Sequence, residues 1–405
     1  MAPNSPAERR RAWPRPVRGD LLFALAVFGV YGIAVGLSIA IDKLRVDPMM
    51  EVAINVLHGH LDSNAIKGGA DVVNVSGHYY LALGPLQLLP YLPFAMVPEL
   101  QTICRYAVGV MCGVPAALLS LPLARAWGAR GKDAYWIGAF TAFGSLLLFV
   151  SVVGDMYYLA HAESFLGLTI FLIEWRGRRR AAVLGTAMAF SFLARPTTVV
   201  AVIPFGLLLL RERRASLPAI TARALAFGAP LVLGLLIFGW FNWLRFGSPF
   251  ESGYSISSLV DASLMQRRAQ GLFSLAQVPE NLRLFLLATP RLSASFPFAI
   301  PSQYGMSMLL VSPALLTSLW AGFRDRSAQL LWLAAGLVAL PVFLYYGGGF
   351  VQYGFRYSLD FTPFLIALMA MGSQRWTGAF ERLLIVASIV SVSGLGLLCD
   401  LAWNV

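Results

Sequence analysis

Long stretches without a charged residue are the feature that most constrains this chain. Apolar runs of about 18–20 residues recur between residues 21 and 401, and an α-helix needs this length to cross the hydrocarbon core of a bilayer. Hydrophobic residues make up 58% of the 405 residues and charged residues 13%, against roughly 45–50% and about 25% in an average soluble domain. The sequence therefore predicts an all-α, polytopic transmembrane helical bundle and excludes a soluble multidomain enzyme.

We expect about 11 membrane spans, which form a single transmembrane domain over residues 21–401. The first span is longer than the roughly 7–15-residue apolar core of a cleaved signal peptide, so we expect it to be retained. Residues 1–20 form a polar tail, rich in Pro and Arg, that is not expected to fold on its own. The expected spans are residues 21–41, 106–124, 134–153, 160–173, 181–194, 197–210, 225–243, 304–323, 329–346, 355–371 and 383–401.

The distribution of charge between the spans predicts the orientation of the bundle. Six alternate segments hold 20 of the 31 Arg and Lys residues but only 7 of the 20 Asp and Glu residues. Because cytoplasmic loops are enriched in Arg and Lys, we expect these segments and the N-terminus inside, and the short C-terminus, residues 402–405, outside. The net charge of +11 thus reflects orientation and does not indicate nucleic-acid binding. The six segments are residues 1–20, 125–133, 174–180, 211–224, 324–328 and 372–382.

One pair of spans is predicted to form a hairpin. Residues 181–210 are apolar apart from Arg195, and arginine clusters flank them at both ends. A single helix of this length would measure about 45 Å, whereas the hydrocarbon core is about 30 Å thick. Because proline disrupts a helix interior, we expect a break between Arg195 and Pro196. The break places Arg195 below the outer surface, where a charge needs a partner or a wet cavity.

The remaining polar residues gather on the predicted external side. They occupy two long external loops, residues 42–105 and 244–303, a turn at residues 155–163, and the stretch 345–360. Residues 81–97 in the first loop are apolar but contain three prolines, so we expect them to lie along the membrane rather than cross it. This pattern predicts a structured first external loop that covers a site at the outer face of the membrane.

The first external loop holds the strongest candidate acids. Apolar residues recur at helical spacing over residues 49–58, so Asp47 and Glu51 are expected on one face of a short surface helix. Asp47 is equally suited to cap that helix, because Asp before Pro is a common helix start. Both interpretations of Asp47 stay open at this point. His58 and His60 have a spacing too short for a pair of metal ligands on one helix.

Six short segments follow one another along the chain: VDPMMEVAINVLHGHL, GHYYLALGPLQLLPYLP, HAESFLGL, FLARPTTVV, FNWLRFGSPFESGY and FRYSLDFTPFL. In this order, and with this topology, the chain resembles the GT-C superfamily of membrane glycosyltransferases. The similarity is greatest to the branch that includes protein O-mannosyltransferases and lipid A aminoarabinose transferases. The first loop lacks a His-Pro-Pro-type sequence and no soluble domain follows the last span, so a protein acceptor is less favoured.

The resemblance implies transfer of a sugar from a polyprenyl-phosphate carrier to an envelope glycan or lipid acceptor at the external membrane face. It implies that an acid early in the first external loop is the general base. By position this acid is Asp47, with Glu51 as a reserve. The second acid of the family corresponds to Asp155, or to Glu163, and Arg356 resembles a contact to the donor phosphate. Members of the superfamily differ in their use of a divalent cation, so the metal stays undecided and no other cofactor is implied.

The residue types on the external side suit such a transfer. The reaction needs a carboxylate within hydrogen-bond reach of the acceptor hydroxyl and fixed cations that stabilise the departing phosphate. Arginine binds phosphate through a planar fork of donors and keeps its charge when it is buried. The predicted donor-phosphate contacts are Arg356, Arg195, Arg245 and Tyr357, and the predicted sugar or acceptor contacts are His161, His78 and Tyr80.

Two other functions stay open. One is a transporter or flippase of lipid-linked sugars, which predicts a repeat between the halves of the chain or polar residues near the bilayer midplane, and neither is evident. The other is a non-catalytic, GT-C-like membrane scaffold, which would tolerate loss of the acids. We therefore expect a multi-pass enzyme of a bacterial plasma (inner) membrane, with its N-terminus cytoplasmic, its active site external, and membrane lipids around it.

Overall fold

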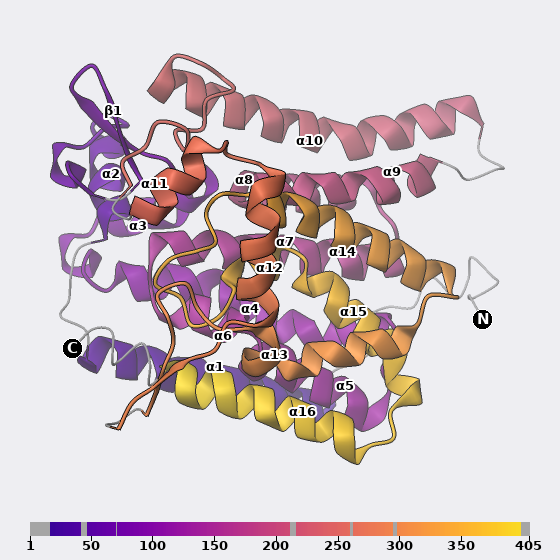
Figure 1. The fold of residues 1–405 in the computed structure, drawn as a ribbon. Coiled ribbons are helices and arrows are strands. Elements are labelled where there is room, and N and C mark those ends of the chain that lie inside the picture. Colours follow the sequence, from indigo (N-terminus) through magenta and orange to yellow (C-terminus); the bar gives the residue numbers. More distant parts are fainter. Residues whose placement is uncertain are drawn as a thin grey trace.

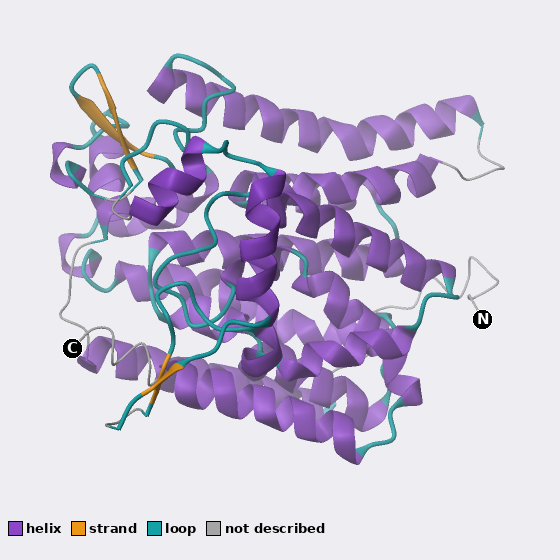
Figure 2. Cartoon of the chain, viewed as in Figure 1, coloured by secondary structure: helices purple, strands orange, loops and turns teal. Residues whose placement is uncertain are grey.

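A computed structural model describes residues 17–41, 47–69, 71–210, 216–259, 262–294 and 298–397. Helices dominate these residues, and the strands belong to two short hairpins (Figure 2). The predicted all-α membrane protein is thereby confirmed at the level of fold class. Most of the predicted tail, residues 1–20, and the whole predicted C-terminus, residues 402–405, lie outside the described residues.

Among the described residues, six helical segments are long and apolar enough to cross a membrane. A seventh candidate consists of two helical segments with a bend of 42° between them. The first segment is α5 (Gly131–Ala139) with the π-helical η5 (Phe140–Gly144), and the second is α6 (Leu146–Val152). The bend has a local cause, because Ser145 is extended and its hydroxyl accepts a hydrogen bond from the Leu147 amide, which starts a new helix. The six are α1 (Arg18–Ile41), α4 (Cys104–Ala126), α7 (Met156–Arg176), α10 (Leu217–Phe246), α14 (Arg326–Leu344) and α16 (Ala379–Ile389) with the π-helical η11 (Val390–Gly396).

The four other expected spans coincide with shorter helices, so eleven crossings are not established. These helices pack among the long ones, which run side by side in Figure 1. They are α8 (Ala181–Ala194), α9 (Val202–Leu210), α13 (Met308–Val311) with the 3₁₀ segment η8 (Pro313–Ala321), and α15 (Thr362–Gly372), which is followed by η10 (Ser373–Arg375).

Helix α7 lies at the centre of the bundle and α10 at its edge. Phe165, Leu168 and Phe171 on α7 have no exposed surface, whereas Leu236 and Trp240 on α10 are more than half exposed. Side chains of this kind on an outer helix match the hydrocarbon of a bilayer, which needs no polar cover. The core is therefore built around α7, and this helix positions the residues at its first turns.

The chain folds back at Arg195 and Pro196, as expected. Helix α8 ends at Ala194, Arg195 is extended, and the 3₁₀ segment η6 (Pro196–Ala201) leads into α9. On the returning helix, the ring of Phe205 lies 4.7 Å from that of Trp175, which precedes α8 in the sequence. The two legs are therefore antiparallel, and Arg195 lies at the tip of the hairpin.

The long loops gather at one end of the bundle, where α1, α8, α10 and α14 finish and α4 and α7 begin. We call it the loop end. Arg125, Arg180 and Arg382 lie at the opposite end, paired with acids at 2.6, 2.9 and 3.8 Å. The predicted separation of charge therefore corresponds to two physical ends of the bundle.

The first loop folds into short elements at the loop end. Val72 pairs with Leu81 in the antiparallel hairpin of β1 and β2. The apolar part after this hairpin forms helices of six, four and three residues, too short to cross a bilayer, as expected. The elements are α2 (Pro48–Leu57), η2 (Asn64–Ile66), β1 (Val72–Val75), β2 (His78–Leu81), η3 (Leu86–Tyr91), α3 (Leu92–Ala95) and η4 (Pro98–Leu100).

The second loop and the late polar stretch complete the loop end. Helix α12 runs across the direction of the long helices (Figure 1), and the hairpin of β3 and β4 pairs Arg291 with Ile300. Asn281 on α12 donates hydrogen bonds of 2.8 Å to the carbonyls of Phe343 and Tyr345, so the loop is fixed to the end of α14. The elements are α11 (Ala262–Ala269), η7 (Leu275–Gln277), α12 (Val278–Leu286), β3 (Arg291–Leu292), β4 (Ala299–Ile300) and η9 (Arg356–Asp360).

Packing of the hairpin against α10 depends on a glycine. A Cβ added at Gly185 would lie 2.2 Å from the carbonyl oxygen of Phe227, so the two helix backbones are in direct contact there. We expect Gly185→Ala to force the helices apart and lower the free energy of unfolding by about 2 kcal/mol, measured by denaturant titration in detergent. Gly228→Ala is the matched control, because its Cβ would meet no atom within 4 Å. Equal stability of the two variants would contradict this packing.

Candidate functional site

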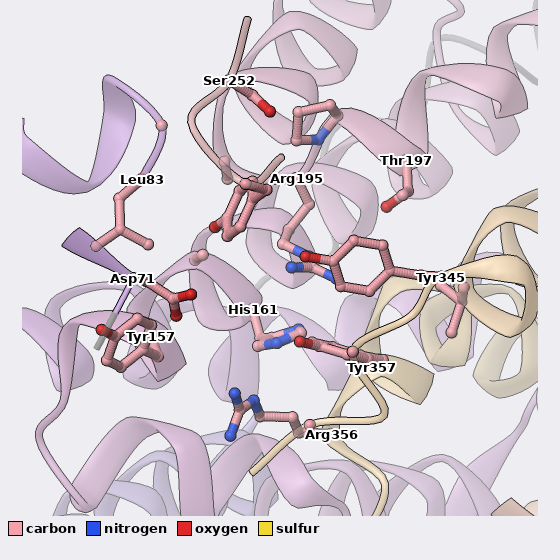
Figure 3. Close-up of a pocket in the computed structure, with 18 of the residues that line it drawn as sticks. Asp71, Leu83, Tyr157, His161, Arg195, Thr197, Ser252, Tyr345, Arg356 and Tyr357 are labelled. Atoms are coloured by element: carbon pink, nitrogen blue, oxygen red, sulfur yellow. The ribbon is translucent and has the colours of Figure 1, made fainter. Parts of the chain in front are cut away.

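A cavity of about 570 Å³ lies at the loop end, between the start of α7, the hairpin tip and the two long loops. Its walls come from five separate parts of the sequence, and Figure 3 shows their side chains converging. Apolar side chains also line it, among them Leu83, Phe238, Leu264 and Val342. The polar lining residues are Asp71, Gln87, Asp155, Tyr157, Tyr158, His161, Arg195, Thr197, Asn242, Ser252, Tyr254, Tyr345, Tyr346, Arg356 and Tyr357.

Arg195 lines the cavity and forms an ion pair with Asp360, a residue with no exposed surface. Nη2 and Nε of Arg195 lie 3.0 and 3.1 Å from Oδ2 of Asp360, and the Thr197 hydroxyl donates to the same oxygen at 3.0 Å. The guanidinium also lies over the ring of Tyr357, 4.8 Å from its centre. The expected buried arginine therefore has a carboxylate partner and still contributes to the cavity wall.

Arg356 is a second guanidinium in the wall, with a different set of contacts. Its Nη1 donates to the Phe350 carbonyl at 2.8 Å, and its Cζ lies 4.9 Å from the centre of the Tyr158 ring. The residue is 7% exposed, and its Nε has no hydrogen-bond partner among the described residues. A buried donor without an acceptor is costly, so this guanidinium retains hydrogen-bonding capacity that the described residues do not use.

His161 lies between the two arginines (Figure 3). Its imidazole is buried, Nδ1 is 3.4 Å from Oδ1 of Asp360, and its ring centre is 5.3 Å from that of Tyr357. Neither ring nitrogen has a hydrogen-bond partner within the described parts of the chain. The predicted contact residue therefore faces the cavity with unsatisfied hydrogen-bonding capacity.

The two acids that we predicted as catalytic occupy different positions. Asp155 lines the cavity and caps α7, where its Oδ1 accepts from the Tyr157 amide at 2.7 Å. Asp47 does not line the cavity. It caps α2, as the second interpretation proposed, and its Oδ1 accepts from the Met49 amide at 2.8 Å. Its Oδ2 accepts from the Tyr91 hydroxyl at 3.1 Å, so both oxygens are occupied.

Asp47 lies directly behind Asp155. Its Oδ2 also accepts from the amide of Met156, the first residue of α7, at 3.2 Å. Burial raises the pKa of both carboxyls, and repulsion by Asp155 raises that of Asp47 further. Arg105 partly offsets the rise in the pKa of Asp47, and Arg356 and Arg105 partly offset the rise in that of Asp155. Because two adjacent carboxylates resist ionising together, we expect this pair to retain a proton more readily than an isolated aspartate.

Asp71 is a third acid, and we did not predict it. It lines the cavity beside Tyr157 (Figure 3). Burial raises its pKa to about 6, and the opposite charges of Arg356 and Arg268 limit that rise. Asp360 was not predicted either, although it lies in the FRYSLD segment. No sequence signal singled out Asp71, whereas the burial cost of Arg195 already required an acid like Asp360.

Besides Asp47, five predicted site residues do not line the cavity. Arg245 is buried, but it donates to the Leu81 carbonyl at 2.6 Å and to Asn242 at 3.0 Å, so it joins β2 to α10. The other four are Glu51 on α2, Glu163 (bonded to Gln87 at 3.1 Å), His78 (paired with Asp62 at 2.8 Å) and Tyr80, whose ring contacts Phe246. The cavity brings together Asp155, His161, Arg195, Arg356 and Tyr357.

The arrangement has the components of an anion site next to acids. Two guanidiniums and several tyrosine hydroxyls face a space that carboxylates also enter, and part of its wall is apolar. No group of three His, Cys, Asp or Glu residues within the described ranges is arranged to hold a metal ion. No family model, no curated protein and no solved structure matches this chain.

The ion pair of Arg195 and Asp360 makes a prediction about stability. Asp360→Asn removes a fully buried counterion from a partly buried guanidinium, so we expect the free energy of unfolding to fall by about 3 kcal/mol. The control is Glu280→Gln, which breaks the exposed pair with Arg283 and should cost less than about 1 kcal/mol. Denaturant titration in detergent measures both. A loss for Asp360→Asn no larger than that of the control contradicts the buried pair.

Proposed function

We propose that this protein is a membrane glycosyltransferase. It moves a sugar from a polyprenyl-phosphate carrier to an envelope glycan or lipid acceptor, as the resemblance to the GT-C superfamily implies. The observation that carries the proposal is Arg356, a buried guanidinium in the cavity wall whose Nε has no hydrogen-bond partner in the described part of the chain. A phosphate supplies the acceptor oxygens that this donor lacks, and a guanidinium binds it through two parallel hydrogen bonds.

The composition of the cavity supports a donor that is part lipid. A second hollow, almost entirely apolar, lies between the hairpin and α14 and shares Phe273 with the cavity. Val200, Ile203 and Leu340 contribute to its wall. In the proposal the phosphate lies at Arg356, the sugar lies toward the acids, and the prenyl chain leaves through this hollow into the bilayer. Burial of the chain in an apolar groove avoids its exposure to water.

The chemistry follows from these positions. The acceptor hydroxyl attacks the anomeric carbon, the bond from that carbon to the phosphate oxygen breaks, and its electron pair stays on the phosphate. Arg356 and Arg195 stabilise the added negative charge, since donors fixed in a buried site need no reorganisation. A carboxylate of the cavity takes the acceptor proton. Of the two acids predicted from the sequence, Asp155 is in position to contact substrate, and Asp47 positions Asp155.

We also propose an orientation in a bacterial plasma membrane, with the loop end outside. The support is the charge of the opposite end, where Arg125, Arg180 and Arg382 lie as arginines do in cytoplasmic segments. In this orientation the cavity faces away from cytoplasmic nucleotides, which suits a lipid-linked donor. A flippase needs the same substrate but no acid, so loss of the acids separates the two functions.

Substitution of Arg356 tests the proposed donor site. We expect Arg356→Ala to weaken binding of polyprenyl phosphate at least 10-fold, because the buried fork of donors is lost. Arg356→Lys should restore little, since a single ammonium cannot reproduce two parallel bonds. Binding is measured by quenching of intrinsic fluorescence in detergent, and transfer by tritiated polyprenyl-phosphate hexoses and pentoses in proteoliposomes with total membrane lipids.

The matched control is Arg291→Gln, an exposed arginine on β3 outside the cavity. It should leave binding and transfer at the wild-type level. Unchanged affinity for polyprenyl phosphate in Arg356→Ala would count against the phosphate site. Transfer by none of the donors in the wild-type protein would overturn the proposed function itself.

Cysteine labelling tests the orientation. In a chain with Cys399 replaced by Ser, we expect Ala65→Cys at the loop end to react with a membrane-impermeant maleimide on intact cells. Lys132→Cys, at the arginine end, should react only after the membrane is opened. Both positions are exposed, and Cys104 and Cys112 are buried and protected. The reverse pattern would place the cavity in the cytoplasm.

A further inference from the structure

Asp71 is the cavity acid that our proposed mechanism has not used. It precedes β1 and enters the cavity beside Tyr157, on the side away from Tyr345 and Tyr357 (Figure 3). We propose that Asp71 is the residue that takes the proton of the acceptor hydroxyl, and that the acceptor therefore binds between the first loop and the start of α7. This inference rests on the proposed function and assigns its acceptor side.

The backbone around Asp71 is clamped by a residue far away in the sequence. The Asp71 amide donates to the Ser258 carbonyl at 3.0 Å, and the Ser258 amide donates to the Val72 carbonyl at 2.8 Å. The Ser258 hydroxyl donates to the Gly69 carbonyl at 2.7 Å, and the Val72 amide donates to that hydroxyl at 3.2 Å. The carbonyl of Asp71 accepts from Ala82 at 2.9 Å. The two long loops thus hold this one acid in place.

The backbone conformation of Asp71 is unusual. Its φ is 54°, in the left-handed region that non-glycine residues seldom adopt. Such a conformation costs free energy and persists where the surrounding contacts enforce it, often at functional sites. Here the hydrogen bonds to Ser258 and Ala82 enforce it, and the result is a carboxylate that faces the cavity.

The surroundings of Asp71 suit a base better than those of Asp155. Asp155 has one oxygen committed to the Tyr157 amide and a second carboxylate, Asp47, behind it, which favours a shared proton. Both acids accept a hydrogen bond and both are attracted by Arg356, so what separates them is the carboxylate of Asp47 next to Asp155. A pKa of about 6 leaves Asp71 ionised at neutral pH and basic enough to accept a proton.

Several other groups face the same space. The titratable neighbours are the hydroxyls of Tyr157, Tyr254, Tyr345 and Tyr346, and the Ser257 hydroxyl contacts the carboxylate. Burial raises the pKa of Tyr254, Tyr345 and Tyr346, so these hydroxyls do not compete with Asp71 as the base. In the step proposed, the acceptor O–H bond breaks and its proton moves to Asp71. The acceptor oxygen bonds to the anomeric carbon, and the proton then leaves to water.

The test compares Asp71→Asn, Asp71→Glu and wild-type protein in the proteoliposome assay with tritiated polyprenyl-phosphate sugars and total membrane lipids. We expect Asp71→Asn to lower kcat at least 100-fold and to bind polyprenyl phosphate as the wild type does. The wild-type rate should fall below about pH 6, as protonation removes the base, and Asp71→Glu should retain that limb with reduced kcat. Asp62→Asn, in the same loop but paired with His78 at the surface, is the control.

The outcomes separate this inference from the proposed function. If the wild-type protein transfers sugar and Asp71→Asn transfers it at a near-normal rate, the role of Asp71 is overturned but the proposed glycosyltransferase is not. Absence of transfer by the wild type overturns both. The unfolding midpoint shows whether Asp71→Asn is folded, and it should match or exceed that of the wild type, because removing a buried charge relieves its desolvation. A folded Asp71→Asn protein with normal donor affinity and lost turnover supports the assignment.

Discussion

The polar wall of the cavity depends on the ion pair of Arg195 and Asp360. A charge at this depth is tolerated only with a partner, and the pair joins the tip of the hairpin to η9. Tyr357 lies under the guanidinium and His161 beside the carboxylate, so the same pair fixes both rings between the two arginines. Asp360 pairs with Arg195 and not with Arg356, whose Nε has no hydrogen-bond partner among the described residues.

Three aspartates near the cavity show how surroundings separate identical side chains. Asp47 has hydrogen bonds on both oxygens and supports Asp155 from behind. Asp155 reaches the cavity but shares its surroundings with that second carboxylate. Asp71 is held by Ser258 and faces cations. The roles assigned to these acids therefore follow from what each contacts, since all three lie at the same end of the bundle.

Sequence patterns predicted what is encoded locally. Long apolar runs predicted the long helices. The Arg195–Pro196 pair predicted the break in the hairpin, because proline disrupts the helix in which it lies. The number of membrane crossings was harder to predict, because the apolar sequence continues past residues at which a helix ends. Ser312, between α13 and η8, is an example. Asp71 could not be predicted, because its direction depends on hydrogen bonds to a loop 187 residues away. Arg245 is an arginine at the same end of the bundle as Arg195, but its guanidinium donates a hydrogen bond to the Leu81 carbonyl instead of lining the cavity.

The mixed character of the cavity restricts what can fill it. A fully water-soluble ligand, such as a nucleotide sugar, would place hydroxyls against Phe238, Leu264 and Val342, where they find no hydrogen-bond partner and lose their hydration. A purely apolar ligand would leave the Nε of Arg356 unsatisfied. A molecule with an anionic head and an apolar chain satisfies both walls at once. In the proposed reaction the acceptor presents its hydroxyl to the acids of the cavity, while the chain of the donor lies along the apolar residues.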